Sequence, residues 1–149
     1  MMNKRSLSGI VAASIVTLGL TTSAFADVSC PSVSEVKKAV TALNTVMRQS
    51  ERTYFVLSAQ PAFNSSDLDW MIAAQASGNG FDAAYSNGQS AVKGVVAAAT
   101  DTPIEQNGFL MCAYMSSTGG MNVMTIAQQK QKFSLTPSVL NFDLFNVKK

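Results

Sequence analysis

The sequence contains no histidine, and this absence excludes many functions at once. Ser-His-Asp triads, Cys-His nucleophile pairs, histidine-ligated zinc and histidine pH switches all require that side chain. Charge is also scarce, since 13% of the 149 residues are charged, with 11 Lys plus Arg against 9 Asp plus Glu. We therefore expect a protein that is not an enzyme and that binds no nucleic acid through a basic surface.

Long apolar runs are absent except near the start, where Gly9 to Leu20 is almost uncharged. Lys4 and Arg5 precede this run and Ala24-Phe25-Ala26 follows it, a pattern typical of a cleaved secretory signal peptide. A membrane span needs about 20 apolar residues, so a retained anchor is the weaker interpretation. We predict a cleaved signal at residues 1–26, a mature domain at residues 27–149 with no membrane span after cleavage, and export to the periplasm or full secretion.

Cysteine is nearly absent as well, with Cys30 and Cys112 the 2 cysteines of the chain. Neither belongs to a Cys-x-x-Cys motif, and in an exported protein two cysteines most simply form one structural disulfide. The mature region is formally neutral, because Lys4 and Arg5 lie in the signal and leave 9 basic residues against 9 acidic ones. Its length suits a single domain.

The first half of the mature region predicts a helix followed by a pair of strands. Ser32 and Glu35 have the spacing of a helix-capping box. Apolar residues then recur at helical intervals, namely Val33, Val36, Val40, Leu43 and Met47. The pattern predicts a strand from Arg52 to Gln60, a turn-rich link from Phe63 to Ser66 and an antiparallel second strand from Leu68 to Ala76. The alanines that end this second run suit a helix as well.

The second half repeats the order of a helix followed by two strands. After the glycine-rich break at residues 77–80, we expect one helix from Phe81 to Thr100 with a weak point at Asn87-Gly88. The runs from Phe109 to Met115 and from Met121 to Ala127 predict a hairpin across a glycine-rich connection. Because Cys112 lies in the middle of the first of these runs, the disulfide would join the start of the first helix to a central strand.

This order of elements predicts the fold class. We expect an α+β domain with one antiparallel sheet of about four strands, two helices on one face and one disulfide. Residues 128–149 would add an edge strand or a tail, since Pro137 argues against a central strand there.

Methionine is the least ordinary feature of the composition, with 8 in the chain. Met111 and Met115 share one face of their predicted strand, and Met124 can approach them across the turn. Thioethers bind soft metals or haem iron, and flexible methionines also form adaptable apolar binding surfaces. Core packing is the more frequent role of methionine on a strand, so both interpretations stay open.

The tyrosines bear on the same question. Without histidine, a haem ligand from this chain would be Met, reduced Cys or Tyr, and the tyrosine candidates are Tyr54, Tyr85 and Tyr114. Each suits a core aromatic with its hydroxyl at the surface equally well. Asp67 and Asp69 supply too few oxygens for a calcium site, and we predict no metal site.

Four short pieces occur in an order found in a known family. Ala24-Phe25-Ala26-Asp27 ends the signal, Cys30-Pro31-Ser32-Val33 opens the mature chain, Trp70 lies in a mid-chain strand, and Cys112-Ala113-Tyr114 precedes a glycine-rich turn. In this order, over Cys30 to Ala127, the chain resembles small exported proteins of Legionella and related bacteria that share a domain of unknown function, some of them called hemin-binding protein. The resemblance implies a bacterial extracytoplasmic protein, with hemin as a cofactor or ligand or a role in host interaction.

Two functional hypotheses follow. The leading one is an exported, non-catalytic binding protein whose ligand is hemin or another flat apolar molecule. The alternative is a secreted, virulence-associated interaction protein that binds a host or envelope protein through an exposed sheet edge and has no small-molecule ligand. An exposed edge at Phe133 to Phe145 would favour the alternative.

Overall fold

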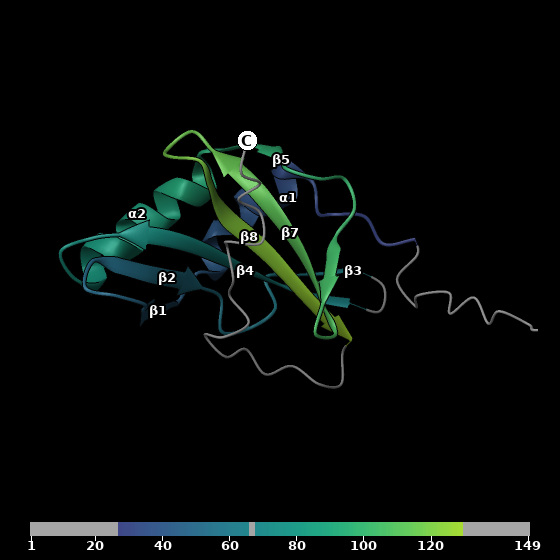
Figure 1. The fold of residues 1–149 in the computed structure, drawn as a ribbon, viewed down its shortest axis with the longest axis horizontal. Coiled ribbons are helices and arrows are strands. Elements are labelled where there is room, and N and C mark those ends of the chain that lie inside the picture. Colours follow the sequence, from purple (N-terminus) through teal and green to yellow (C-terminus); the bar gives the residue numbers. More distant parts are fainter. Residues whose placement is uncertain (1–26, 66–67, 130–149) are drawn as a thin grey trace, which may run out of the picture.

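The computed structural model describes residues 27–65 and 68–129, which form an α+β fold with one antiparallel sheet (Figure 1). The helices are α1 (Val33–Lys38), the short 3-10 helix η1 (Ala39–Ala42) and α2 (Phe81–Lys93). The strands are β1 (Thr45–Arg48), β2 (Thr53–Leu57), β3 (Phe63–Ser65), β4 (Leu68–Ser77), β5 (Val95–Ala98), β6 (Ile104–Gln106), β7 (Phe109–Ser116) and β8 (Met121–Gln129). The predicted signal at 1–26 and most of the predicted edge or tail at 128–149 lie outside the described residues.

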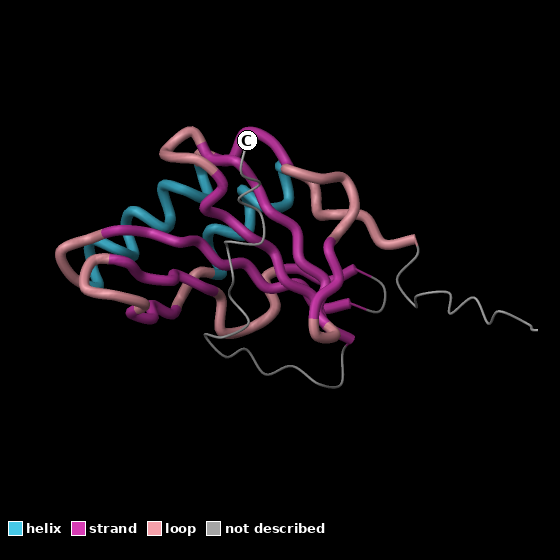
Figure 2. The backbone as a smooth tube through the Cα atoms, viewed as in Figure 1, coloured by secondary structure: helices cyan, strands magenta, loops and turns pink. Residues whose placement is uncertain are grey.

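The sheet has the order β1-β2-β4-β8-β7-β5, with β3 pairing β4 and β6 pairing β7 (Figures 1 and 2). The two predicted strand pairs are confirmed: β2 pairs with β4, and β7 pairs with β8. Pairing of β4 with β8 joins the two pairs into one sheet. The expectation of about four strands was wrong, because the described residues contain eight. The other four strands are short, and two of them replace segments that we predicted as helix.

Strand β1 is the first of these corrections, because the predicted first helix does not continue to Met47. The capping box is present as predicted, with the Ser32 hydroxyl accepting from the Glu35 N–H at 3.3 Å and the Glu35 carboxylate accepting from the Ser32 N–H at 2.7 Å. The helix nevertheless tightens into η1 and ends before Leu43. The Asn44 side-chain oxygen accepts from the Ala59 N–H at 2.8 Å, which turns the following residues into register with β2.

Strand β5 is the second correction, because α2 ends at Lys93 rather than at Thr100. A Cβ on Gly94 would lie 2.8 Å from the Ser117 hydroxyl oxygen and 3.1 Å from the Ser90 carbonyl oxygen, so glycine suits the close approach at which the chain leaves the helix. The β-branched Val95 and the residues after it then pair with β7. The predicted weak point at Asn87-Gly88 does not interrupt α2.

Strands β3 and β6 are three residues each and pair with longer neighbours. The segment Phe63 to Ser66, which we predicted as a link, supplies β3, and the Phe63 ring stacks on that of Trp70 with centroids 6.3 Å apart. Alternation is not readable over three residues, so sequence patterning does not detect strands of this length.

The sheet has two different faces. The helical face buries the larger core, which includes Val36 of α1, Val92 of α2, and Ile72 and Tyr114 of the sheet. Figure 1 shows α1 and α2 on this same side, as the sequence predicted. The opposite side, which we call the helix-free face, carries a second cluster formed by strand residues alone, including Phe55 and Ile126.

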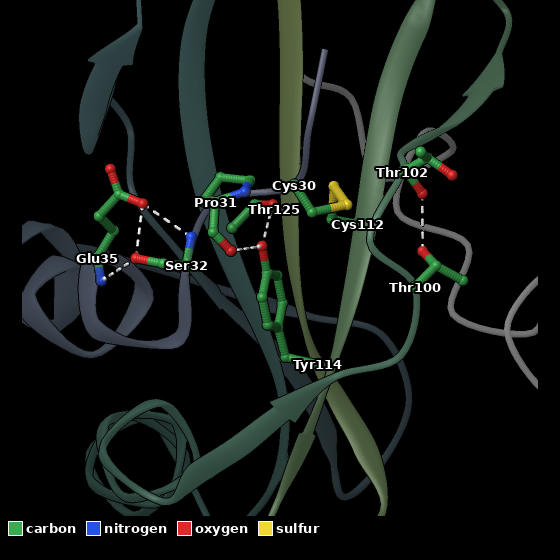
Figure 3. The surroundings of a disulfide bond; sticks show 9 residues. All are labelled: Cys30, Pro31, Ser32, Glu35, Thr100, Thr102, Cys112, Tyr114 and Thr125. Atoms are coloured by element: carbon green, nitrogen blue, oxygen red, sulfur yellow. Dashed lines mark hydrogen bonds between the residues drawn. A yellow bond between two sulfur atoms is a disulfide. The ribbon is translucent and has the colours of Figure 1, made fainter. Parts of the chain in front are cut away.

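The predicted disulfide is confirmed and joins Cys30 to Cys112 of β7, with their Cα atoms 5.8 Å apart (Figure 3). Strand β7 lies between β8 and β5 in the sheet. The segment that leads into α1 is therefore attached covalently to an interior strand. The Cys30 N–H also donates to the Asp101 carbonyl oxygen at 3.0 Å, so this segment is held at two points.

Candidate functional site

The six methionines of the described residues gather on the helix-free face. Side chains alternate between the two faces along each strand, and both neighbours of Met71 and of Met111 belong to the helical core. Four strands contribute: Met47 from β1, Met71 from β4, Met111 and Met115 from β7, and Met121 and Met124 from β8. Met71, Met111 and Met124 are 3%, 1% and 0% exposed, so half of this group packs in the interior. Methionines that do reach solvent can adapt to apolar molecules of irregular shape.

The three methionines proposed from the sequence differ in exposure. Met111 and Met124 are 1% and 0% exposed, and the register places Met124 opposite Ala113, one position along the same face from Met111. Met115 is 46% exposed, because a register shift between Tyr114 and Met115 lies next to it at the end of the hairpin. The structure thus brings all three to one face, with Met115 alone in solvent.

A pocket of about 370 Å³ opens on the helix-free face where β1, β2 and β4 meet. Met47, Leu57 and Met71 form its apolar wall, and the segment after β2 lines it as far as Pro61. Thr45 and Gln60 supply the polar groups of its lining. Small-molecule sites commonly combine an apolar wall with a few polar groups, and this volume is at the lower end of their range of about 300 to 1,000 Å³.

Sequence reasoning missed the two methionines of this pocket. Met47 was assigned to a helix, where its partners would have been other residues of that helix. Met71 was placed correctly in a strand, but its neighbour in the pocket comes from β1, which was not predicted. The methionine enrichment is a signal that could have found this pocket, but we applied it to Met111, Met115 and Met124, which do not line it.

The three tyrosines lie on the helical side and do not meet the methionines. The Tyr54 ring packs edge-to-face on Phe81 of α2, with centroids 5.5 Å apart. The Tyr85 hydroxyl donates to the Leu43 carbonyl oxygen at 2.9 Å. These contacts give both rings a place in the packing of α2 against the sheet and its neighbouring segments.

Tyr114 is fully buried beside the disulfide (Figure 3). Its hydroxyl donates to the Pro31 carbonyl oxygen at 2.8 Å and lies 3.4 Å from the Thr125 hydroxyl. Burial raises the pKa of Tyr114 to about 12, because the phenolate would lose its hydration, and the Thr125 hydroxyl only partly offsets this. An iron-bound tyrosine is a phenolate, so this environment opposes that role for Tyr114.

Metal-binding clusters and membrane-spanning helices are both lacking in the part of the chain that the structure describes. No three His, Cys, Asp or Glu side chains come together there to hold an ion. None of the helices described is long and apolar enough to cross a membrane.

Comparison with known proteins adds no family to this description. The chain matches no protein-family model, no curated protein and no solved structure.

Proposed function

We propose that this chain is an exported, non-catalytic binding protein that holds a flat apolar ligand on the helix-free face. The observation that carries the proposal is the pocket walled by Met47, Leu57 and Met71, at the border of a face with six methionines. Burying an apolar ligand surface there would stabilise the complex by about 25 cal/mol per Å². The disulfide Cys30–Cys112 supports export, because such bonds persist in oxidising compartments.

Hemin is one ligand of this class. The residues of the pocket suit apolar contact with the porphyrin ring better than coordination of the iron. The pocket methionines offer thioethers, which are soft ligands, whereas the hydroxyls of Tyr85 and Tyr114 donate to backbone carbonyls on the other side of the sheet. We therefore propose that a porphyrin is held by apolar contacts on the methionine side, with one edge of the ring in the pocket.

The test is a titration of the oxidised chain with hemin and, separately, with iron-free protoporphyrin, followed by porphyrin absorbance. We expect saturable binding of both porphyrins with affinities within about tenfold of each other, since the iron contributes little (tenfold corresponds to about 1.4 kcal/mol). Tyr54→Phe, Tyr85→Phe and Tyr114→Phe should leave both titrations unchanged. Absorbance changes that never saturate, or loss of hemin binding in one tyrosine variant, would overturn the proposal.

A second candidate function rests on a different surface. Val96 on the edge strand β5 is 62% exposed, and Met115, which pairs with the next β5 residue Ala97, is 46% exposed. Ile104, opposite Met111 farther along β7, is 38% exposed. Exposed apolar side chains on an edge strand favour a protein partner, as in the alternative of a secreted interaction protein. The register shift between Val95 and Ala97 argues against simple strand addition, because bulges protect edges from pairing.

A comparison of two variants distinguishes the two candidate functions. If a host or envelope protein binds β5, Val96→Lys should abolish capture of that protein by the oxidised chain, while Thr41→Lys, an exposed change on η1, should not. Porphyrin binding should be the same in both variants. The edge at Phe133 to Phe145, which would have favoured this candidate, lies outside the described residues.

A further inference from the structure

A second pocket, of about 580 Å³, opens where β4 and β8 separate. The two strands pair as far as Ala74 opposite Val123, and β4 then continues beside β2 to Ser77. Helix α2 and the turn between β7 and β8 line the remaining sides. The pocket shares no lining residue with the methionine pocket, so the two sites are independent.

The lining of this pocket is polar but uncharged. Seven of its nine lining residues carry a hydroxyl or a side-chain amide, and none carries a carboxylate, an ammonium or a guanidinium group. A cation would find no opposite charge in the lining, and neither would an anion. A ligand that matches the pocket is therefore neutral and forms many hydrogen bonds.

Hydrogen bonds within the protein determine which groups remain for a ligand. The Asn87 amide nitrogen donates to the Ser77 carbonyl oxygen at 2.7 Å, and the Gln75 amide nitrogen donates to the Gln49 side-chain oxygen at 2.9 Å. The Ser90 hydroxyl donates to the Ser86 carbonyl oxygen at 3.0 Å. These bonds use donors, so the pocket is left richer in acceptors.

Asn122 gives an independent indication at the same place. Its side-chain oxygen is buried, and no hydrogen-bond donor reaches it among the described residues. Asn122 lies at the register shift of β8, where Val123 pairs with Tyr114 and Met121 pairs with Met115, so it has no partner in the ladder. A buried acceptor without a donor costs about 1 to 3 kcal/mol. Because the oxygen is closed to solvent, the Asn122 side chain must rotate toward the pocket for a ligand hydroxyl to remove that cost.

We propose that this pocket binds a neutral polyhydroxylated molecule, such as a sugar residue, whose hydroxyls donate to Asn122, Asn87 and Gln75. A pyranose ring carries several hydroxyl donors at close spacing and no charge, which matches the excess of acceptors. An extended peptide is a poorer match, because β4 extends only three residues beyond its last pair with β8.

The test uses NMR of the oxidised chain with three probes: uncharged methyl glucoside, cationic glucosamine and anionic glucuronate. We expect methyl glucoside alone to shift the side-chain amide signals of Asn87 and Asn122 in a saturable manner. Asn122→Leu removes the acceptor at similar volume and Ser90→Ala removes a hydroxyl, and each should weaken binding roughly three- to tenfold. Thr41→Val, an exposed change outside the pocket, is the matched control and should bind like the parent chain.

Each remaining outcome would overturn the proposal. Shifts that do not saturate would show that the pocket takes no sugar. Equal or tighter binding of glucosamine would indicate a site for cations, and unchanged affinity in Asn122→Leu and Ser90→Ala would place the sugar elsewhere. Amide spectra of both variants confirm that the fold is retained before affinities are compared.

Discussion

The hydroxyl of Tyr114 ties together three parts of the molecule that are far apart in sequence. It bonds to Pro31 before α1 and lies beside Thr125 of β8, while its own strand carries Cys112 two residues earlier. Tyr114→Phe would leave the Pro31 carbonyl oxygen without its donor in a buried setting. We expect the free energy of unfolding to fall by about 1 to 3 kcal/mol, measured by urea denaturation.

Tyr85→Phe is the matched control, because the Tyr85 hydroxyl also bonds to a backbone carbonyl but is only partly buried. Water can replace its hydrogen bond, so we expect a smaller loss. Equal losses in the two variants would contradict the importance of burial at Tyr114.

Tyr114 also gives the protein a dependence on alkaline pH. Because burial raises its folded pKa from 10.0 to about 12, the folded state holds the phenol proton more tightly than the unfolded state does. The resulting stabilisation is complete below pH 10 and is lost as the pH rises toward 12. The free energy of unfolding should therefore fall more steeply over this interval in the parent chain than in Tyr114→Phe, and parallel curves would refute this.

Some residue roles could be predicted from the sequence, and others could not. The capping box was predictable because it depends on the local spacing of Ser32 and Glu35. The disulfide was predictable because a chain with two cysteines allows one pairing within the molecule. The position of Met47 in the pocket was not predictable, because it depends on register with Phe55 of β2, eight residues later.

Helix α2 shows why a glycine within a helix is not always a weak point. A Cβ on Gly88 would lie 2.7 Å from the Val56 Cβ, so α2 approaches β2 closely only because that side chain is absent. Gly88→Ala gains about 1 kcal/mol of helix propensity but must displace β-branched Val56. Overpacking costs about 1 to 3 kcal/mol, and since a Cβ–Cβ approach this short cannot be relieved by rotating a side chain, we expect net destabilisation in thermal unfolding.

Two further variants isolate this contact. Ser86→Ala changes an exposed position of α2 and should be neutral or slightly stabilising. In the double variant Gly88→Ala with Val56→Ala, the loss should be smaller than the sum of the single losses, because the contacts with the two Val56 Cγ atoms, at 2.7 and 3.1 Å, are gone and only the Cβ–Cβ contact remains. Additive losses would show that Gly88 matters for another reason.

At the scale of elements, long strands and the central part of each helix were predictable, whereas helix ends were not. Apolar residues at helical spacing continue past Ala42 and past Lys93, but tertiary contacts convert the chain to strands β1 and β5 at these points. The Asn44 bond to Ala59 and the tight space at Gly94 decide both changes, and neither is visible in the period of the sequence.

At the scale of the whole molecule, one covalent bond links the N-terminal segment to the sheet. The Cys30–Cys112 disulfide closes a loop with a sequence separation of 82, which would stabilise the folded state by about 4 to 5 kcal/mol through the entropy of the unfolded chain. Cys30→Ala with Cys112→Ala should lose a comparable amount, measured by urea denaturation. Reductant should destabilise the parent chain and leave the double variant unchanged, and an equal response of both would contradict the prediction.

The sheet as a whole separates two kinds of chemistry. Hydroxyl-bearing tyrosines and the helices lie on one face, and the methionines lie on the other. Sequence patterning predicted the α+β class and the helical face, and strand alternation already puts Tyr114 opposite Met111 and Met115. It could not place Tyr54 and Tyr85 relative to the methionines. That separation is why we place a flat apolar ligand on the methionine side alone.

The most direct measurement is NMR of the oxidised chain with labelled methionine methyl groups, titrated with iron-free protoporphyrin. Signals are assigned with Met47→Gln, Met71→Gln and Met115→Gln. We predict saturable shifts of the Met47 and Met71 methyls and an unchanged Met115 methyl, with binding weakened by Met47→Gln but not by Met115→Gln. Unshifted Met47 and Met71 signals, or equal weakening by both substitutions, would contradict this prediction.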